Sequence, residues 1–212
     1  MASVEQGPVS NRLVERVKNI LFTPNTEWDV IEAEPATIQG LYKGYICVLA
    51  AIGPIAQFIG SQMFGYHALW ITYRPSFVSS LIQAVVSYFL SLAGVYVLAL
   101  IIDGLAPGFG AQKNQIQAFK VAAYSMTAFW VFAVFSLVPM VSALGVLGLY
   151  SLYLFYLGLP KLMKAPEDKA LVYSVVTIVA AVVVLAVING VSYSIVGSGG
   201  MPVASGGSLS VN

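Results

Sequence analysis

Charged residues along this chain fall into clusters, and the stretches between the clusters are apolar. The segments free of Lys, Arg, Asp and Glu are residues 44–73, 75–102, 121–160 and 170–212. A helix that crosses the hydrocarbon core of a bilayer, about 30 Å thick, needs about 20 apolar residues. Every one of these segments is long enough, so the pattern predicts a helical membrane protein with several spans.

The segment 121–160 is too long for a single span. Its 40 residues would form a straight helix of about 60 Å, roughly twice the thickness of the hydrocarbon core. Pro139 lies almost at its middle and is the expected turn of a hairpin. The predicted fold is therefore an all-α polytopic membrane protein with five transmembrane helices, over residues 41–64, 78–102, 121–138, 141–159 and 170–196.

An amphipathic helix is predicted before the first span, over residues 11–22. Its apolar residues recur at helical spacing on one face, and these are Leu13, Val14, Val17, Ile20 and Leu21. The other face carries the charges, among them Arg12, Arg16 and Lys18. A basic amphipathic helix of this kind lies in the headgroup plane of a membrane. Packing against the cytosolic ends of the spans is the alternative, and the sequence leaves both open.

A second short helix is predicted over residues 25–34. Thr23 is the expected N-cap, Pro24 the first helical position and Pro35 the end of the helix. Trp28 is placed to anchor this helix at the membrane interface. Residues 1–40 thus form a cytoplasmic segment, 41–196 the membrane domain, and 197–212 a Gly- and Ser-rich tail that is expected to be disordered.

The spans contain features that predict their shape and packing. Pro54 lies in the middle of the first span and is expected to kink it. The second span should break at the sequence DGLAPG, residues 103–108. Small residues four apart permit close helix packing, within the bundle or between copies. Small residues lie on one side of the second span, at Ala84, Ser87 and Ser91, and recur every four residues in the fifth, at Ala186, Gly190 and Ser194.

The distribution of cations predicts the orientation. With five spans, the N-terminal segment and the loops 103–120 and 160–169 share one side of the membrane. That side holds nine of the ten Lys and Arg residues, and Arg74 alone lies on the other. Cytoplasmic loops carry the excess of Lys and Arg, so we expect a cytoplasmic N-terminus and an external C-terminus. Four spans would divide the cations six against four, which supports the hairpin independently.

Composition excludes several classes of function. The chain is 58% hydrophobic and only 9% charged, whereas a soluble domain carries about 25% charged residues. The net charge of +1 does not suggest a nucleic-acid partner. His67 is the single histidine and Cys47 the single cysteine, so no metal-binding cluster and no activated nucleophile is evident. We therefore expect neither enzymatic activity nor a cofactor.

The candidate sites are interfacial or interaction residues. Asp103 lies at the expected cytoplasmic end of the second span, where a helix cap or a salt bridge to a nearby Lys is the favoured role. Juxtamembrane cations attract anionic lipid, but the acidic residues interleaved with the C-terminal lysines make that patch modest. The full set of candidates is Arg12, Arg16, Lys18, Trp28, Asp103, Lys161, Lys164 and Lys169.

Two stretches of the chain resemble the Yip family, membrane proteins first named for interacting with Ypt/Rab GTPases. One is RVKNILFTP at residues 16–24 with EWDVI at 27–31, and the other is YLGLPKLMKAPEDK at 156–169. YSMT at 124–127 is a weaker third element, followed by Ala128 where the family pattern has proline, which suggests a straighter third helix here. The chain looks like the short bacterial branch, because the long polar N-terminal region of eukaryotic members is missing.

The resemblance implies five spans and an N-terminus in the cytoplasm, but it does not supply a mechanism. Eukaryotic members are implicated in vesicle trafficking, and a bacterial cell has no Rab cycle to which that role would apply. The function expected is a non-enzymatic component of the bacterial inner membrane that organises the membrane or contacts lipid or protein partners, including further copies of itself. The alternative is a small transporter or channel for a neutral solute, with Pro54 opening a cavity.

Overall fold

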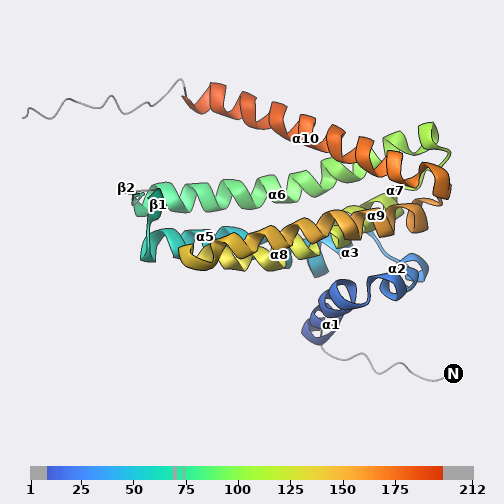
Figure 1. The fold of residues 1–212 in the computed structure, drawn as a ribbon, viewed down its shortest axis with the longest axis horizontal. Coiled ribbons are helices and arrows are strands. Elements are labelled where there is room, and N and C mark those ends of the chain that lie inside the picture. The colour runs from blue at the N-terminus through green and yellow to red at the C-terminus, as the bar shows by residue number, and fades with distance from the viewer. Residues whose placement is uncertain (1–8, 69–70, 74, 198–212) are drawn as a thin grey trace, which may run out of the picture.

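The long helices of this protein run side by side as a bundle, with two N-terminal helices against one end of it (Figure 1). The computed structural model describes residues 9–68, 71–73 and 75–197. The short antiparallel hairpin of β1 (Tyr66–Ala68) and β2 (Ile71–Tyr73) lies at the opposite end. The predicted all-α polytopic fold is confirmed, and the hydropathy pattern gave no sign of this small hairpin.

The N-terminal segment folds into α1 (Val9–Phe22) and α2 (Pro24–Ala33). Thr23 and Pro24 occupy the predicted positions at the start of α2, but the Thr23 hydroxyl does not cap this helix. It donates instead to the carbonyl of Asn19 at 3.0 Å. Thr23 therefore closes the last turn of α1, and the extended backbone at Glu34, before Pro35, ends α2 as expected.

The first span is built from four consecutive pieces. These are α3 (Ile38–Leu41), the π-helical turn η1 (Tyr42–Ile46), α4 (Cys47–Ala50) and α5 (Ile52–Met63). The helix is interrupted at Ala51, three residues before Pro54. Pro54 lacks an N–H and its ring clashes with the carbonyl of Ala50, so the predicted disturbance is confirmed. The π-helical turn was not predicted.

The second span is the single long helix α6 (Phe77–Leu105), which continues into the 3-10 turn η2 (Ala106–Phe109). The hydroxyl of Ser76 caps α6 by accepting a hydrogen bond from the Ser79 N–H at 3.1 Å. The turn ends at Gly110, whose φ of 73° lies in the left-handed region that favours glycine. The break predicted to begin at residue 103 therefore comes at Ala106.

The third span begins earlier than predicted, at Gln115 instead of Val121. The side-chain oxygen of Asn114 accepts a hydrogen bond from the Gln117 N–H at 3.2 Å and caps the helix. The span consists of α7 (Gln115–Ser125), α8 (Thr127–Phe132) and the 3-10 segment η3 (Ala133–Leu137). Lys120, expected in the preceding loop, consequently lies inside α7.

The expectation of a straighter third helix is wrong, because the helix is interrupted at Met126. The N–H of Phe129 donates to the hydroxyl of Ser151 at 2.8 Å. The hydroxyl of Thr127 donates to the Tyr124 carbonyl at 2.6 Å. These side-chain bonds compete with the backbone ladder, so the break arises here without a proline.

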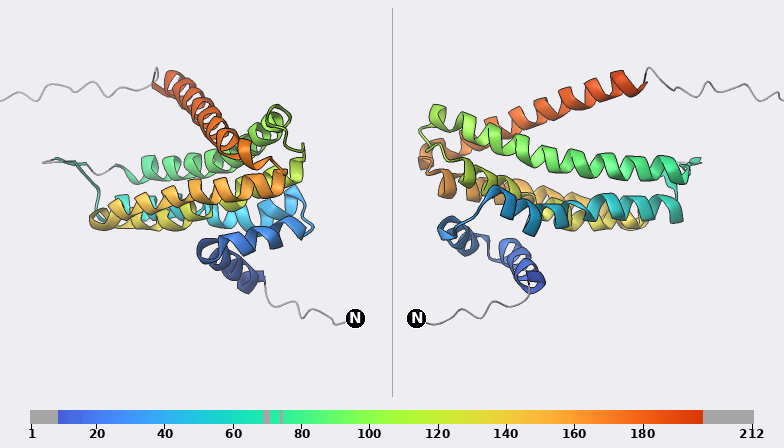
Figure 2. Two further views of the ribbon diagram at one scale, coloured as in Figure 1. Left: turned by 45° about the vertical axis from the view of Figure 1, so that its right-hand side comes forward. Right: turned by 180° about the vertical axis from the view of Figure 1, so that it is seen from behind.

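The predicted hairpin is confirmed, with its turn where Val138 leaves the helical conformation and Pro139 begins the next element. That element is the 3-10 segment η4 (Pro139–Leu149), which continues as α9 (Tyr150–Met163). α9 ends at Lys164, a non-glycine residue with a φ of 52°. The last helix, α10 (Glu167–Gly197), diverges from α6 toward its C-terminal end (Figures 1 and 2).

Four helical stretches of the described chain are long and apolar enough to cross a membrane. They are Ile38–Met63, Phe77–Phe109, Gln115–Leu137 and Met140–Met163. α10 is 31 residues long, which exceeds the roughly 20 needed for a span, and its sequence carries no charge after Lys169. Five spans remain the prediction.

The third span forms the centre of the bundle. In its 18-residue apolar stretch 61% of the residues are buried, against 17% in the corresponding stretch of the α6 span. The small-residue face of α6 is used inside the bundle. Ser91 accepts a hydrogen bond from Nε1 of Trp130 at 3.2 Å, and Ala84 and Ser87 are half-buried. In α10, the predicted fifth span, Ala186 is exposed, and the side chains beyond it lie outside the described residues.

Candidate membrane-surface site

The helices α1 and α2, residues 9–33, are termed the docked lobe, because a buried tryptophan fastens them to the bundle. Trp28 is fully buried and packs edge-on against Tyr124, with ring centroids 6.4 Å apart. A Cβ at Gly158 would lie 2.5 Å from the indole, so glycine in α9 makes room for it. The predicted role of Trp28 as an interfacial anchor is therefore wrong, since this side chain belongs to the protein core.

Lys120 caps the C-terminal end of α2 from the centre of the bundle. Its Nζ donates to the carbonyls of Ile31 at 2.7 Å, Glu32 at 3.3 Å and Glu34 at 2.6 Å. Only 3% of Lys120 is exposed. The last carbonyls of a helix lack hydrogen-bond donors within the helix and carry partial negative charge. A buried ammonium group at this end supplies the donors and also neutralises the charge. Lys120 is a structural cation that joins two distant segments.

Two of the three C-terminal lysines also contact the docked lobe. Lys161 Nζ donates to the Asp29 carboxylate and to the Asn25 carbonyl, both at 2.6 Å. Lys164 forms an ion pair with Glu32. Lys169 is exposed and forms no ion pair within the described residues. The proposed lipid-facing patch is thus reduced, because protein carboxylates engage Lys161 and Lys164.

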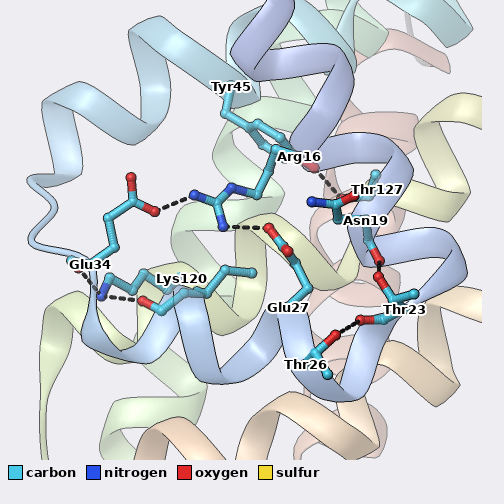
Figure 3. A network of polar contacts seen from close by, with 10 residues as sticks. Arg16, Asn19, Thr23, Thr26, Glu27, Glu34, Tyr45, Lys120 and Thr127 are labelled. Atoms are coloured by element: carbon cyan, nitrogen blue, oxygen red, sulfur yellow. Dashed lines mark hydrogen bonds and ion pairs between the residues drawn. The ribbon is translucent and has the colours of Figure 1, made fainter. Parts of the chain in front are cut away.

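Arg16 lies at the centre of a polar network beneath α1 (Figure 3). Its guanidinium donates to Glu27 at 2.5 Å and pairs with Glu34, and it lies 5.7 Å from the centre of the Tyr124 ring. Next to it, the hydroxyls of Tyr45 and Thr127 are 2.6 Å apart. Because Arg16 binds a carboxylate at each end of α2, it fixes α1 on α2 and both on the bundle.

A pocket of about 780 Å³ opens beside this network, between α1, the end of α2 and the start of the first span. This volume falls in the range of small-molecule sites, about 300–1,000 Å³. Its polar wall contains charged residues of both signs, namely Arg12, Glu15, Arg16, Glu27 and Glu34. Its apolar wall comes from Leu13, Val30, Pro35, Leu41, Tyr45 and Tyr124, among others. The surface is therefore amphipathic.

The π-helical turn η1 contributes Gly44 and Tyr45 to this pocket. A π-helical turn holds one extra residue per turn and occurs frequently at functional sites. A Cβ on Gly44 would meet no atom within 4 Å. The glycine therefore leaves open space on this wall, whereas neighbouring Tyr45 is buried.

The outward face of α1 carries exposed apolar residues. Val14 is 63% exposed and Phe22 is 77% exposed, with exposed Lys18 between them at helical spacing. The hydroxyl of Tyr150, at the start of α9, donates to the carbonyl of Leu21 at 3.2 Å. Tyr150 is thirteen residues from Met163 at the helix end, or about 20 Å along the axis. The C-terminal end of α1 therefore reaches well along the span.

Asp103 is buried, but it does not form the salt bridge that the sequence suggested. It is 9% exposed, its Oδ1 has no hydrogen-bond partner, and no ion pair involves it among the described residues. The neighbouring Tyr173 of α10 donates to the Ile102 carbonyl at 2.5 Å and stacks on Phe109. Asp103 thus lies where α10 joins α6.

Metal-ligating groups do not assemble in the part of the chain that the structure describes. No cluster of three His, Cys, Asp or Glu residues there is arranged to hold a metal ion. The backbone of His67 lies in β1, and Arg74, the predicted external cation, lies outside the described residues.

Sequence reasoning missed the residues that complete the site, which are Glu27, Glu34, Tyr45, Lys120 and Tyr124. One signal was available, because Glu27 and Glu34 are seven residues apart and so share a face of a helix. No local pattern indicates that Lys120 reaches α2, which is 89 residues away in sequence at Ile31.

Apolar helices long enough to span, together with a polar lobe docked at one end, define a polytopic helical membrane protein. The family model of the Yip1 domain matches residues 18–188, which include most of the docked lobe and the bundle. The chain therefore belongs to the Yip family. Comparison with curated proteins and with solved structures gave no match.

Proposed function

We propose that this protein is a non-enzymatic component of the bacterial inner membrane that organises lipid at the cytoplasmic surface through its docked lobe. The observation that carries the proposal is the outward face of α1, where Val14 and Phe22 are exposed beside Lys18. Apolar side chains with an interspersed cation suit the boundary between headgroups and acyl chains.

The position of Phe22 supports contact with the acyl region. Leu21, its neighbour, is held by Tyr150, and the adjacent bundle surface exposes Leu149 and Tyr153. Phe22 thus extends a surface of the bundle that is already apolar. A helix fixed at this depth occupies area in one leaflet only, and so alters the packing of the lipids around it.

The orientation proposed is an N-terminus in the cytoplasm and a C-terminus outside. Lys120, Lys161 and Lys164 all contact α2. The start of α10, which carries Lys169, lies at the same end of the bundle (Figure 1). Cations gathered at one end are expected to face the cytoplasm.

A transport function finds no comparable support. Between α5 and α6, Gln62 donates to the Ser80 hydroxyl at 2.8 Å, and Ser61 lies 3.4 Å from the same oxygen. The space beside this polar cluster has no volume for a water molecule. The groups bind one another and do not line a path.

Spin labelling tests whether α1 enters the bilayer. In a Cys47→Ala background reconstituted in liposomes, a label at Phe22→Cys should collide readily with oxygen and poorly with a water-soluble nickel complex. A label at Asn25→Cys, on the exposed start of α2, should show the reverse. Equal nickel accessibility at the two positions would contradict the proposal.

Measurement of lipid packing tests whether the inserted helix α1 alters the surrounding bilayer. Laurdan fluorescence in proteoliposomes should differ from that of protein-free vesicles, and Phe22→Glu should abolish the difference because a carboxylate resists burial among acyl chains. Asn25→Glu adds the same charge to the same lobe and should preserve the wild-type signal. A wild-type signal from Phe22→Glu would overturn the functional claim even if the labels had shown insertion.

A further inference from the structure

The charged side chains that line the pocket beneath α1 restrict the class of ligand that it can bind. Five charged side chains line it, two arginines against three glutamates, so the wall carries one excess negative charge. Arg16 is already engaged by Glu27 and Glu34. An anionic ligand would therefore meet net repulsion from the wall as a whole.

The pocket nevertheless retains a cation for a ligand. Arg12 is exposed and forms no ion pair within the described residues. Glu15 lies three residues further along α1, on the same side of the helix, and is also without an ion pair there. On the opposite wall, the Glu34 side chain is 49% exposed even though it binds Arg16. Within the described residues the unpaired groups are thus the Arg12 guanidinium and the Glu15 carboxylate, while the Glu34 carboxylate is accessible although Arg16 already binds it.

The apolar lining of the pocket and its position at the start of the first span further restrict the class of ligand that fits. Leu13, Val30 and Leu41 line the same pocket as these charges. Leu41 ends the first turn of the first span, so the pocket lies at the depth where headgroups meet acyl chains. A ligand that fits has an anionic and a cationic group close together and an apolar portion attached to them.

We propose that this pocket binds a zwitterionic phosphate–ammonium headgroup. Arg12 binds the phosphate, Glu15 and Glu34 face the ammonium group, and the apolar wall receives the start of the acyl chains. The proposal deepens the proposed function, since it names the lipid class that the docked lobe recognises. The same headgroup chemistry also occurs in free glycerophosphoethanolamine. Binding measured separately for the lipid and for the free headgroup distinguishes a membrane ligand from a soluble one.

The experiment measures binding by calorimetry to the full chain purified in detergent. The probes are dihexanoyl phosphatidylethanolamine, its headgroup glycerophosphoethanolamine, and dihexanoyl phosphatidylglycerol, which is anionic. The ethanolamine lipid should bind at least about tenfold more tightly than the glycerol lipid. Equal or tighter binding of the anionic lipid would overturn the proposal. Tight binding of the headgroup alone identifies a soluble ligand, and binding of only the lipid identifies the membrane as source.

Two variants locate the binding. Gly44→Phe fills the pocket from the side where no atom lies within 4 Å, and should weaken binding of the ethanolamine lipid by at least about tenfold. Gly94→Phe is the matched control, because a Cβ at Gly94 of α6 also meets no atom within 4 Å, and it should bind as the wild type does. Unchanged binding in Gly44→Phe would place the lipid elsewhere and overturn the assignment.

A third variant tests the ionic contact. Arg12→Gln removes the free cation and should weaken binding of the ethanolamine lipid about tenfold. Wild-type affinity in this variant would contradict the role of Arg12. Gly44→Phe should leave the membrane depth of a label at Phe22→Cys unchanged. Failure of the pocket proposal therefore remains distinguishable from failure of α1 insertion.

Discussion

The docked lobe and α10 are both attached at the same end of the bundle, yet they are held by different forces. The lobe is fixed to the bundle by a buried indole, by ion pairs with Lys161 and Lys164, and by the Arg16 guanidinium over the Tyr124 ring. α10 makes its described polar contact near its start, where Tyr173 meets Ile102, and it then exposes Val179 and Val183. Its outer half diverges from α6 (Figure 2).

The difference follows from the solvent that surrounds each element. In the predicted five-span arrangement, lipid solvates the apolar side chains of α10 as well as protein does, so α10 is expected to gain little hydrophobic stabilisation by packing along its length. The lobe instead carries charged side chains, among them Arg16, Glu27 and Asp29, and helix ends whose backbone groups need polar partners. Its position must therefore be specified by side-chain partners, and three substitutions test that contrast.

The largest effect is expected from removal of the buried indole. Trp28→Ala leaves a cavity against Gly158 and should destabilise docking of the lobe by about 3–5 kcal/mol. Amide hydrogen exchange in α2, followed by mass spectrometry, should accelerate strongly, while exchange in α6 stays unchanged. Trp28→Phe retains a ring and should have a smaller effect. Slow exchange of α2 in Trp28→Ala would show that the ion pairs alone hold the lobe.

A smaller effect is expected at the cap of α2. Lys120→Met removes the donor to three carbonyls and should destabilise the end of α2 by about 1–3 kcal/mol, because these buried acceptors lose their partner. Exchange should accelerate in residues 31–34 more than in α1. Lys113→Met serves as control, since Lys113 is exposed and should tolerate the same change. Equal effects of the two substitutions would refute the capping role.

The smallest effect is expected in α10. Tyr173→Phe removes the hydroxyl that binds the Ile102 carbonyl and keeps the ring that stacks on Phe109, so it should cost about 1 kcal/mol. Exchange should accelerate modestly in the first turns of α10 and remain unchanged in α2. Acceleration in α2 would show that the attachments of the lobe and of α10 are coupled and are not held by separate forces.

Several elements could be predicted because their causes are local in the sequence. The hairpin at Pro139 and the amphipathic α1 follow from apolar run length and periodicity. The interruption at Met126 could not be predicted, because it depends on Ser151 in another helix. The candidate site was predicted only in part, since Arg16 was singled out for its charge while its partners Glu27 and Glu34 were not.

The sequence by itself determined that the chain crosses a membrane several times, since a bilayer requires long runs of apolar residues and excludes charge from them. It also determined which end carries the cations. The tertiary structure decided what those cations do. Lys120 meets α2 across 89 residues of sequence and Lys161 meets Asp29 across 132. Contacts between distant segments depend on how the helices pack. Packing therefore engaged Lys161, predicted as an interfacial residue, and Lys120, predicted only as a loop cation, in bonds that hold the lobe, and it created the pocket beside it.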